Sequence, residues 1–467
     1  MMDAAQRADG ERRRPGPIVA GAVAAAVMFG LGLVKIGRSF GYDEGFTYAY
    51  FINGGSVRRA LTTQIVFNNH PMFAATQSVA WKLGLTGETA QRLGPLLCGA
   101  VAVGVVVWYT ARRAGIIGGA AAGVVVALNP FFFDNARQLR GYALATMCVV
   151  LAAVALQRSW TDHRRRWLVA QGVCMVVAVT THSYSAVTIL MLAASSLALG
   201  HVRRAHLVTW VTSAVAALAI MSPLIDDIRA NAAARGSRFD ESFPTDLLRA
   251  LGGWERPAVA ITFAAAGIGV FEIGRRSRRH ALALGAAGSV LGAVVLLLWL
   301  VIQPFDLYAR FFISALPLLA VLAGVGVGRV VDGIGRLAGS GSTRLIGQAA
   351  GAGVVVALVL VLAGPVRDLL QTESPIRDAA GMVDRARAAG LEVCGRNTEP
   401  MLVYTAPMPL LSGLDGFGEC EVFVSVLSMS SDVRAAVTAR FDGEARLGGT
   451  VAVFADASVI DAIVAGS

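Results

Sequence analysis

Long apolar runs separated by short polar segments form the main pattern of this chain. About eleven runs of roughly 16 to 22 residues carry almost no charge. A run of this length matches the ~20 helical residues needed to cross the hydrocarbon core of a bilayer. We therefore predict a polytopic α-helical membrane protein with about eleven transmembrane helices. The predicted spans are residues 17–36, 93–111, 114–131, 141–157, 167–181, 183–200, 207–223, 257–274, 281–302, 311–329 and 345–364.

One part of the pattern needs a choice between one helix and two. Residues 167–200 form a single apolar stretch, which is too long for one helix across a core of about 30 Å. The polar segment Thr180–Ser185 interrupts this stretch near its middle. We therefore predict a helical hairpin whose polar tip faces the outer surface.

Composition and charge set the expected class and orientation. The chain is 55% hydrophobic and only 15% charged, which excludes a single soluble core. Its net charge of +10 comes from Arg clusters between the apolar runs, so we interpret it as a topology signal and expect no nucleic-acid partner. With a cytoplasmic N-terminal tail (1–16), Lys and Arg are more than twofold denser inside than outside. The inner clusters include Arg12–Arg14, Arg112–Arg113, Arg164–Arg166, Arg203–Arg204 and Arg275–Arg279.

The segments outside the predicted spans define the domain organisation. We expect a transmembrane domain over 17–364 with a long outer loop, 37–92, followed by a tail, 365–467. The tail is more acidic than the rest and alternates helix-like and strand-like pieces, so we predict a small extracytoplasmic α/β domain. In it we expect helices at 375–389 and 431–440 and strands at 391–395, 421–427 and 450–455.

The five cysteines divide by location. Cys98, Cys148 and Cys174 lie inside predicted spans and are expected to be apolar packing residues. Cys394 and Cys420 lie in the tail, which the topology places in an oxidising compartment, so we predict a disulfide between them. Two buried free thiols are the alternative.

The most suggestive polar feature is the pair Asp43–Glu44, directly after the first span and among aromatic residues. Two adjacent carboxylates near a low-dielectric boundary do not both ionise cheaply, which favours a base, a metal ligand or a hydrogen-bonded pair. The alternative is structural, because Asp43 could cap an interfacial helix.

Several other polar residues are expected at the outer membrane face. His70, in Asn68-Asn69-His70-Pro71, and His182, at the tip of the predicted hairpin, present imidazoles, although each could be an ordinary turn residue. Cations on the outer side oppose the topology bias, and binding an anionic phosphate would explain them; salt bridges or lipid headgroups are the alternative. The remaining outer candidates are Asp134, Arg137, Arg140, Tyr142 and Arg310.

These segments together resemble a known family. The sequence is similar to the polyprenol-phosphate-sugar-dependent glycosyltransferases of the GT-C fold, specifically the protein O-mannosyltransferase and aminoarabinose transferase superfamily. Each motif is weak alone, but they occur in the family's order over about residues 17–330. One departure is Met72, where the family's His-Pro-Pro motif has its second proline. The motifs are Asp43-Glu44, Asn69-His70-Pro71-Met72-Phe73, Glu88-Thr89-Ala90-Gln91-Arg92-Leu93, Arg137-Gln138-Leu139-Arg140-Gly141-Tyr142, Thr181-His182-Ser183-Tyr184 and Tyr308-Ala309-Arg310-Phe311.

The resemblance implies transfer of a sugar from a polyprenyl phosphate to an acceptor hydroxyl at the outer face, with inversion. Asp43 would be the base, with Glu44 as its partner, and Asp134 lies where some members place a second acid. Arg140 or Arg310 would stabilise the leaving phosphate, and Arg137, Tyr142, His70 and His182 complete the expected donor site. A divalent cation, Mg²⁺ or Mn²⁺, is used by some members and would involve Asp43 and Asp134.

Other functions remain open at this point. A transporter or flippase of lipid-linked material would show mid-span charges and paired broken helices, of which the sequence has few signs. A non-catalytic scaffold that presents the tail is a third option. The sugar is not readable from the sequence, with mannose as one candidate, and the acceptor could be glycan, lipid or protein. The Arg- and Ala-rich composition suggests a high-GC, actinobacterial cell envelope.

Overall fold

The structure is a computed structural model. It describes residues 15–65, 69–235, 239–304, 307–337, 341–372, 374–409, 420–427, 429–447 and 450–465. The predicted inner cluster Arg12–Arg14 and Asn68 of the His-Pro segment lie outside the described residues.

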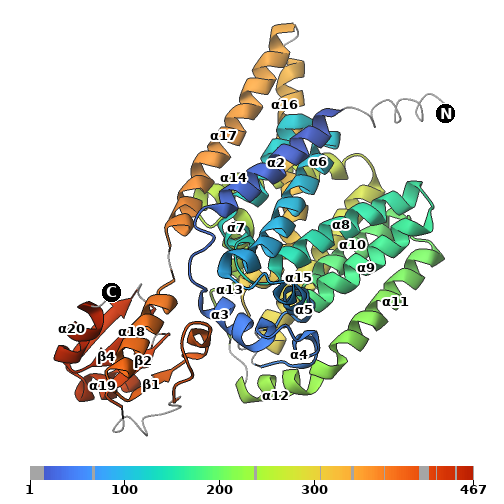
Figure 1. The fold of residues 1–467 in the computed structure, drawn as a ribbon. Coiled ribbons are helices and arrows are strands. Elements are labelled where there is room, and N and C mark those ends of the chain that lie inside the picture. Colours follow the sequence, from blue (N-terminus) through green and yellow to red (C-terminus); the bar gives the residue numbers. More distant parts are fainter. Residues whose placement is uncertain are drawn as a thin grey trace. The chain divides into compact units, whose positions relative to one another are not determined.

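Each predicted span overlaps helical structure (Figure 1), although some span ends, such as residues 34–36 and 128–129, lie outside the helices. Eight helices in the described part of the chain are long and apolar enough to cross a membrane. The chain is therefore a multi-pass membrane protein, as predicted; the side on which each terminus lies stays a prediction. The long helices are α2 (Pro15–Leu33), α6 (Glu88–Ala127), α8 (Tyr142–Thr161), α9 (Arg165–Thr181), α10 (Ser185–Leu199), α11 (Arg204–Met221), α14 (Arg256–Gly274), α15 (Arg278–Leu296), α16 (Leu316–Leu337) and α17 (Gly341–Gln371).

Two breaks in the helices occur where the sequence places them. The second and third predicted spans form α6, which is interrupted by non-helical backbone at Gly115 (φ 76°, ψ 170°). Glycine tolerates this positive φ because it has no Cβ. The predicted hairpin is also present, since α9 ends at Thr181 and α10 begins at Ser185.

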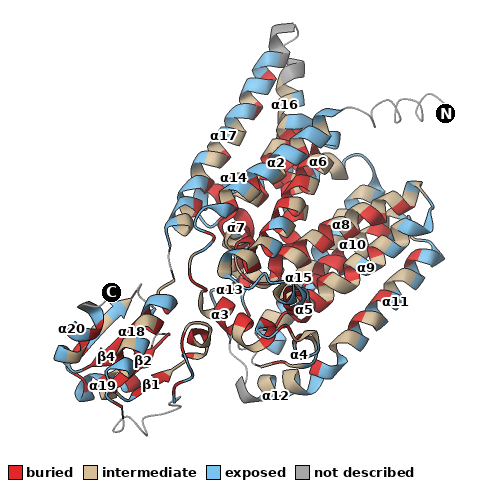
Figure 2. Cartoon of the chain, in the orientation of Figure 1, coloured by how far each residue is buried: buried red, intermediate tan, exposed pale blue. Residues whose placement is uncertain are grey.

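Small residues allow two of the long helices to approach closely. A Cβ atom on Gly326 of α16 would overlap the backbone of Ala265 on α14, and one on Gly269 of α14 would overlap the backbone of Leu322. Small-residue contacts of this kind let helix backbones pack tightly inside a membrane. In Figure 2, α8 and α10 carry many buried positions, whereas α11 is mostly intermediate or exposed. Its exposed Leu207, Val211 and Leu218 suit contact with lipid.

The segments between the spans contain short helices, of which the sequence pattern indicated only the one beside Asp43. These helices are too short to give the long periodic pattern of a span, and four of them (α5, α7, η3 and α13) have a proline in the first turn. They are α3 (Tyr42–Thr47), η1 (Tyr48–Ile52), α4 (Val57–Thr62), α5 (Pro71–Lys82), α7 (Pro130–Ala136), η3 (Ser222–Leu224), α12 (Ile225–Arg235), α13 (Phe243–Gly252), η4 (Leu297–Ile302) and η5 (Ala309–Ala315).

The chain divides into two compact units. Unit 1 comprises residues 1–34, 61–73 and 93–370, and unit 2 comprises 35–60, 74–92 and 371–467. Unit 2 thus joins most of the first outer loop to the tail.

The tail contains a four-stranded mixed sheet in the order β1-β2-β4-β3. β1 pairs with β2 in parallel, and the other two pairs are antiparallel. The predicted small α/β domain is therefore present, with all five predicted elements; β3, α20 and the short η6 were not predicted. The elements are α18 (Ile376–Ala388), β1 (Val393–Arg396), η6 (Glu399–Val403), β2 (Val422–Ser425), α19 (Ser431–Arg440), β3 (Gly443–Leu447), β4 (Val451–Ala455) and α20 (Ala457–Ala465).

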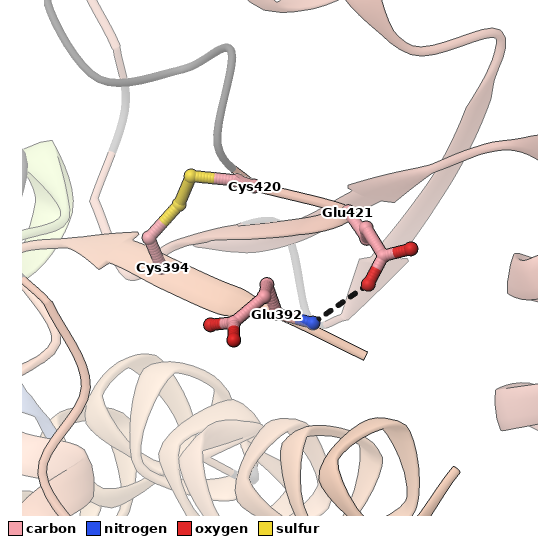
Figure 3. The surroundings of a disulfide bond; sticks show 4 residues. All are labelled: Glu392, Cys394, Cys420 and Glu421. Carbon is pink, nitrogen blue, oxygen red and sulfur yellow. Dashed lines mark hydrogen bonds between the residues drawn. A yellow bond between two sulfur atoms is a disulfide. The ribbon is translucent and has the colours of Figure 1, made fainter. Parts of the chain in front are cut away.

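A disulfide joins Cys394 on β1 to Cys420, which precedes β2 (Figure 3). Their Cα atoms are 5.9 Å apart. Beside this bridge the backbone N–H of Glu392 donates to the Glu421 carboxylate at 2.9 Å. Both cysteines are buried against Phe423.

Candidate active site

The segment that carries Asp43 forms a short helix, α3, in unit 2. Glu44 accepts a hydrogen bond from the backbone N–H of Gly41 at 2.9 Å and thereby closes the first turn. Asp43 lies within that first turn and is half-buried, and its own carbonyl accepts from the Thr47 hydroxyl at 2.8 Å. A helix does begin here, as the structural alternative expected, but Gly41 rather than Asp43 occupies the cap.

The second carboxylate of the pair is bound by an arginine. Nε and Nη2 of Arg92 each lie 2.7 Å from a Glu44 carboxylate oxygen, and Arg92 is fully buried. Its guanidinium also donates to the carbonyls of Ile36 (2.7 Å), Ser39 (3.0 Å) and Arg38. This fork holds the chain between α2 and α3 in place. The geometry gives Glu44 a structural function, and its expected partnership with Asp43 stays a prediction.

In unit 1 the His-Pro segment meets the tip of the α9–α10 hairpin. Nδ1 of His70 lies 3.0 Å from the carbonyl oxygen of Thr181, so this nitrogen carries the proton and Nε2 is an acceptor in the neutral ring. Within the described residues, Nε2 has no hydrogen-bond partner. A Cβ atom at position 141 would come within 3.0 Å of the side chains of Thr181 and His70. Glycine at position 141 therefore lets these two residues lie close to the backbone there.

Aromatic rings surround this histidine. The ring of His70 stacks on His182 with centroids 5.5 Å apart and meets Tyr142 edge-on at 5.1 Å. His182 in turn contacts Phe311 at 5.4 Å, and Phe311 contacts Tyr184 at 4.8 Å. The Tyr142 hydroxyl is buried and has no partner among the described residues. We call His70, Tyr142 and His182 the outer aromatic cluster.

Two arginines act electrostatically on this cluster. Burial, together with the positive charges of Arg140 and Arg310, lowers the pKa of His182 to about 3. The same causes, burial first, hold the pKa of His70 well below its usual range. Both imidazoles are therefore neutral at physiological pH, and the positive charge in this region comes from the guanidinium groups.

Arg137 and Asp134 have other contacts. Nε of Arg137 donates to the carbonyl of Gly32 at 3.1 Å, and Nη2 donates to that of Val34. Arg137 therefore supplies hydrogen bonds to carbonyls at the C-terminal end of α2, where a helix has no backbone donors for them. The Asp134 carboxylate accepts from the Gln138 amide at 2.6 Å. These contacts give Arg137 a structural function, and the expected places of Arg137, Arg140 and Arg310 in the donor site stay predictions.

A metal would need several ligands close together. Among the described residues, no group of three or more His, Cys, Asp and Glu side chains could hold one. We therefore assign no metal ligands and derive no step through a metal; metal dependence stays a prediction.

Unit 1 also contains an apolar cavity of about 680 Å³. One of its lining residues, Ala315, is the last residue of η5, the turn that carries Arg310. Polar groups are few and include Gln157 and Ser195. Its walls come from six long helices, with Val106 (α6), Val150 (α8), Met191 (α10), Phe263 (α14), Leu291 (α15) and Leu318 (α16) as examples.

The structure thus brings together residues from four motifs that are far apart in the sequence: His70, Tyr142, His182 and Arg310. Arg140 lies beside Tyr142, with its Cζ atom 5.6 Å from the ring centroid. Asp43 belongs to the other unit. Sequence reasoning did not single out Arg92, although it lies in one of the quoted motifs.

Comparison with solved structures shows which known proteins have a similar fold. The solved structure of ArnT from Cupriavidus metallidurans in the apo state matches 95% of this chain and 98% of its own, with a TM-score of 0.62 and 17% identity. The same protein bound to undecaprenyl phosphate gives 0.60 and 17%, covering 94% and 98%. The oligosaccharyltransferase AglB from Archaeoglobus fulgidus, in complex with an inhibitory peptide and a dolichol-phosphate, gives 0.53 and 12%, covering 90% of this chain and 70% of its own.

These similarities show that the chain has the GT-C fold, as the sequence motifs predicted. A family model described as dolichyl-phosphate-mannose-protein mannosyltransferase matches residues 68–225, the part that contains His70, Tyr142 and His182. No curated protein matches the sequence.

Proposed function

We propose that this protein is a membrane glycosyltransferase that moves a sugar, a hexose or a pentose, from a polyprenyl-phosphate donor to an acceptor hydroxyl. The reaction takes place at the outer face of the cytoplasmic membrane. The observation that carries the proposal is the outer aromatic cluster with its two arginines, in a unit that also contains a large apolar cavity.

A lipid phosphate needs two environments, and unit 1 offers both. Arg140 and Arg310 supply fixed positive charge for a phosphate, and Tyr142 supplies a buried hydroxyl donor. The cavity that reaches η5 is apolar and suits a hydrocarbon chain. Two of the similar structures are complexes with undecaprenyl phosphate and with a dolichol-phosphate, which agrees with this class of donor.

Asp43 is the candidate base. Glu44 is bound on both oxygens by Arg92, and we assign the base to Asp43, the carboxylate to which the family resemblance gives this role. The acceptor oxygen attacks the anomeric carbon opposite the phosphate and gives its proton to Asp43. The bond between the anomeric carbon and the phosphate oxygen breaks, and its electron pair leaves with the phosphate. Arg140 and Arg310 stabilise this charge, so no acid is needed on the leaving side.

The test uses the purified protein in liposomes with labelled polyprenyl-phosphate sugars, mannosyl and arabinosyl, and glycan, lipid or peptide acceptors. Asp43→Asn is expected to lower the transfer rate about 100- to 10,000-fold, since it removes a general base. Asp226→Asn, an exposed acid on α12, is the matched control and should transfer at the wild-type rate.

Full transfer by Asp43→Asn would refute the assignment of the base. Movement of the labelled donor across the bilayer without any glycosylated product would instead favour a transporter. Which labelled sugar and which acceptor react would identify both substrates.

A further inference from the structure

The tail of this protein contacts the helix that carries Asp43. In unit 2, η6 of the tail lies against α3, and a Cβ atom on Gly45 would come within 2.8 Å of both Cβ and the carbonyl oxygen of Pro400. Tyr42, the residue before Asp43, packs against the hydrophobic core of the tail. Thus residues on both sides of Asp43 rest on the tail.

A tyrosine of the tail fixes the chain that enters α3. The backbone N–H of Phe40 donates to the Tyr404 hydroxyl at 2.6 Å, and that hydroxyl donates to Glu88 at 3.1 Å. Burial raises the pKa of Tyr404, so the phenol keeps the proton that it donates. Arg377 pairs with the same Glu88 carboxylate and lies 5.5 Å from the Tyr404 ring centroid.

The segment that holds this tyrosine is itself anchored to α18. Arg387 donates to the hydroxyl of Thr405 at 3.1 Å and to the carbonyls of Ala406 (3.0 Å) and Pro407 (2.8 Å). The Thr405 hydroxyl donates to Asp384. A continuous set of contacts therefore runs from a packed helix of the tail to the start of α3.

We propose that Tyr404 is a positioning residue for Asp43, so that the tail of the protein completes the transferase site by fixing α3. This inference rests on the proposed function, with Asp43 as the base. A small displacement of a reacting group lowers the rate strongly, whereas binding of a donor at other residues is unaffected.

The first experiment compares Tyr404→Phe with wild type. Loss of the hydroxyl should lower kcat about tenfold and leave the donor KM within about twofold of wild type. Amide hydrogen exchange in residues 45–48 should become about tenfold faster, because α3 loses its fixed entry. Gly45→Ala, which pushes α3 away from Pro400 without removing a hydrogen bond, should lower kcat in the same way.

Arg434→Gln is the matched control, because Arg434 pairs with Glu444 within the tail and should leave kcat and the exchange of α3 unchanged. Wild-type kcat and exchange in Tyr404→Phe would overturn the proposal. A fall in kcat that only follows a loss of folded protein, with no specific change in α3, would also overturn it. If wild type transfers no sugar, the proposed function fails, and the exchange of α3 still decides whether Tyr404 holds that helix.

Discussion

Two regions of this molecule bury charge in opposite ways. In unit 2, the Glu44 carboxylate and the Arg92 guanidinium neutralise each other in a two-point contact, and the remaining guanidinium hydrogens go to backbone carbonyls. In unit 1, Arg140 and Arg310 act on imidazoles that their charge and burial keep neutral. The first arrangement fixes the backbone, and the second is suited to receive an anion.

This difference separates two roles of charged residues, fixing the backbone and binding an anion, which the sequence could not distinguish. Both regions contain charged residues beside aromatic ones at the ends of apolar runs. In unit 2, the buried ion pair of Glu44 and Arg92 stabilises the structure only while both residues are present, because removal of one leaves the other charge buried and unpaired. In unit 1, the Tyr142 hydroxyl and Nε2 of His70 have no partner among the described residues, so a ligand can bind them.

The largest effect on stability is expected at the ion pair. Glu44→Gln leaves a buried guanidinium without its counter-charge and should lower the free energy of unfolding by about 3–5 kcal/mol. Asp43→Asn, one residue away and half-buried, should change it by less than about 1 kcal/mol. Thermal or denaturant unfolding in detergent measures both. Equal stability of the two variants would remove the distinction between the carboxylates.

An intermediate effect is expected at the arginines of unit 1. Arg140→Gln and Arg310→Gln should each raise the donor KM about 10- to 100-fold, since a hydrogen bond to a charged group contributes about 1.5–3 kcal/mol. Arg249→Gln, an exposed partner of Asp246 on α13, is the control and should keep the wild-type KM. Transfer measured against donor concentration decides. Unchanged KM in both site variants would show that the phosphate binds elsewhere.

The smallest effect is a dependence of stability on pH. The pKa of His182 is about 3 in the folded protein, below the ordinary value of 6.5, so the unfolded chain takes up more protons between these values. Stability is therefore fully present above pH 6.5 and is lost as the pH falls towards 3, by at most about 1.4 kcal/mol per pH unit for one histidine. Melting temperatures from pH 7.5 to 4.5 should fall less steeply in His182→Gln. Identical slopes would mean that His182 is not held neutral by burial.

The helical framework could be predicted from the sequence because its signal is local. Each apolar run has the length of a span, the hairpin break coincides with Thr180–Ser185, and the kink in α6 occurs at Gly115 next to Arg112–Arg113. The strands of the tail are also local patterns of β-branched residues. β3 was missed because its sequence, with Glu444 and Arg446 exposed, lacks an apolar run.

The pairings within the site could not be predicted, because they join distant positions. Glu44 and Arg92 are 48 residues apart, and Phe40 and Tyr404 are 364 apart. No local pattern marks Tyr404, which directly follows the short 3-10 turn η6. The family motifs indicated His70, Tyr142, His182 and Arg310 together, but not that Arg137 would be engaged by the end of α2.

Unit 2 combines early and late segments of the chain, and this affects how the protein folds during its synthesis. Phe40 leaves the ribosome 364 residues before Tyr404 does, which corresponds to roughly 20–70 s at a synthesis rate of about 5–20 residues per second. During that time α3 lacks the contacts that Pro400 and Tyr404 of the tail make with it and with the chain that enters it. The helix that carries Asp43 is therefore fully fixed only after residue 404 has been synthesised. A chain that stops before residue 404 would therefore lack the contact of the Tyr404 hydroxyl with the backbone that enters α3.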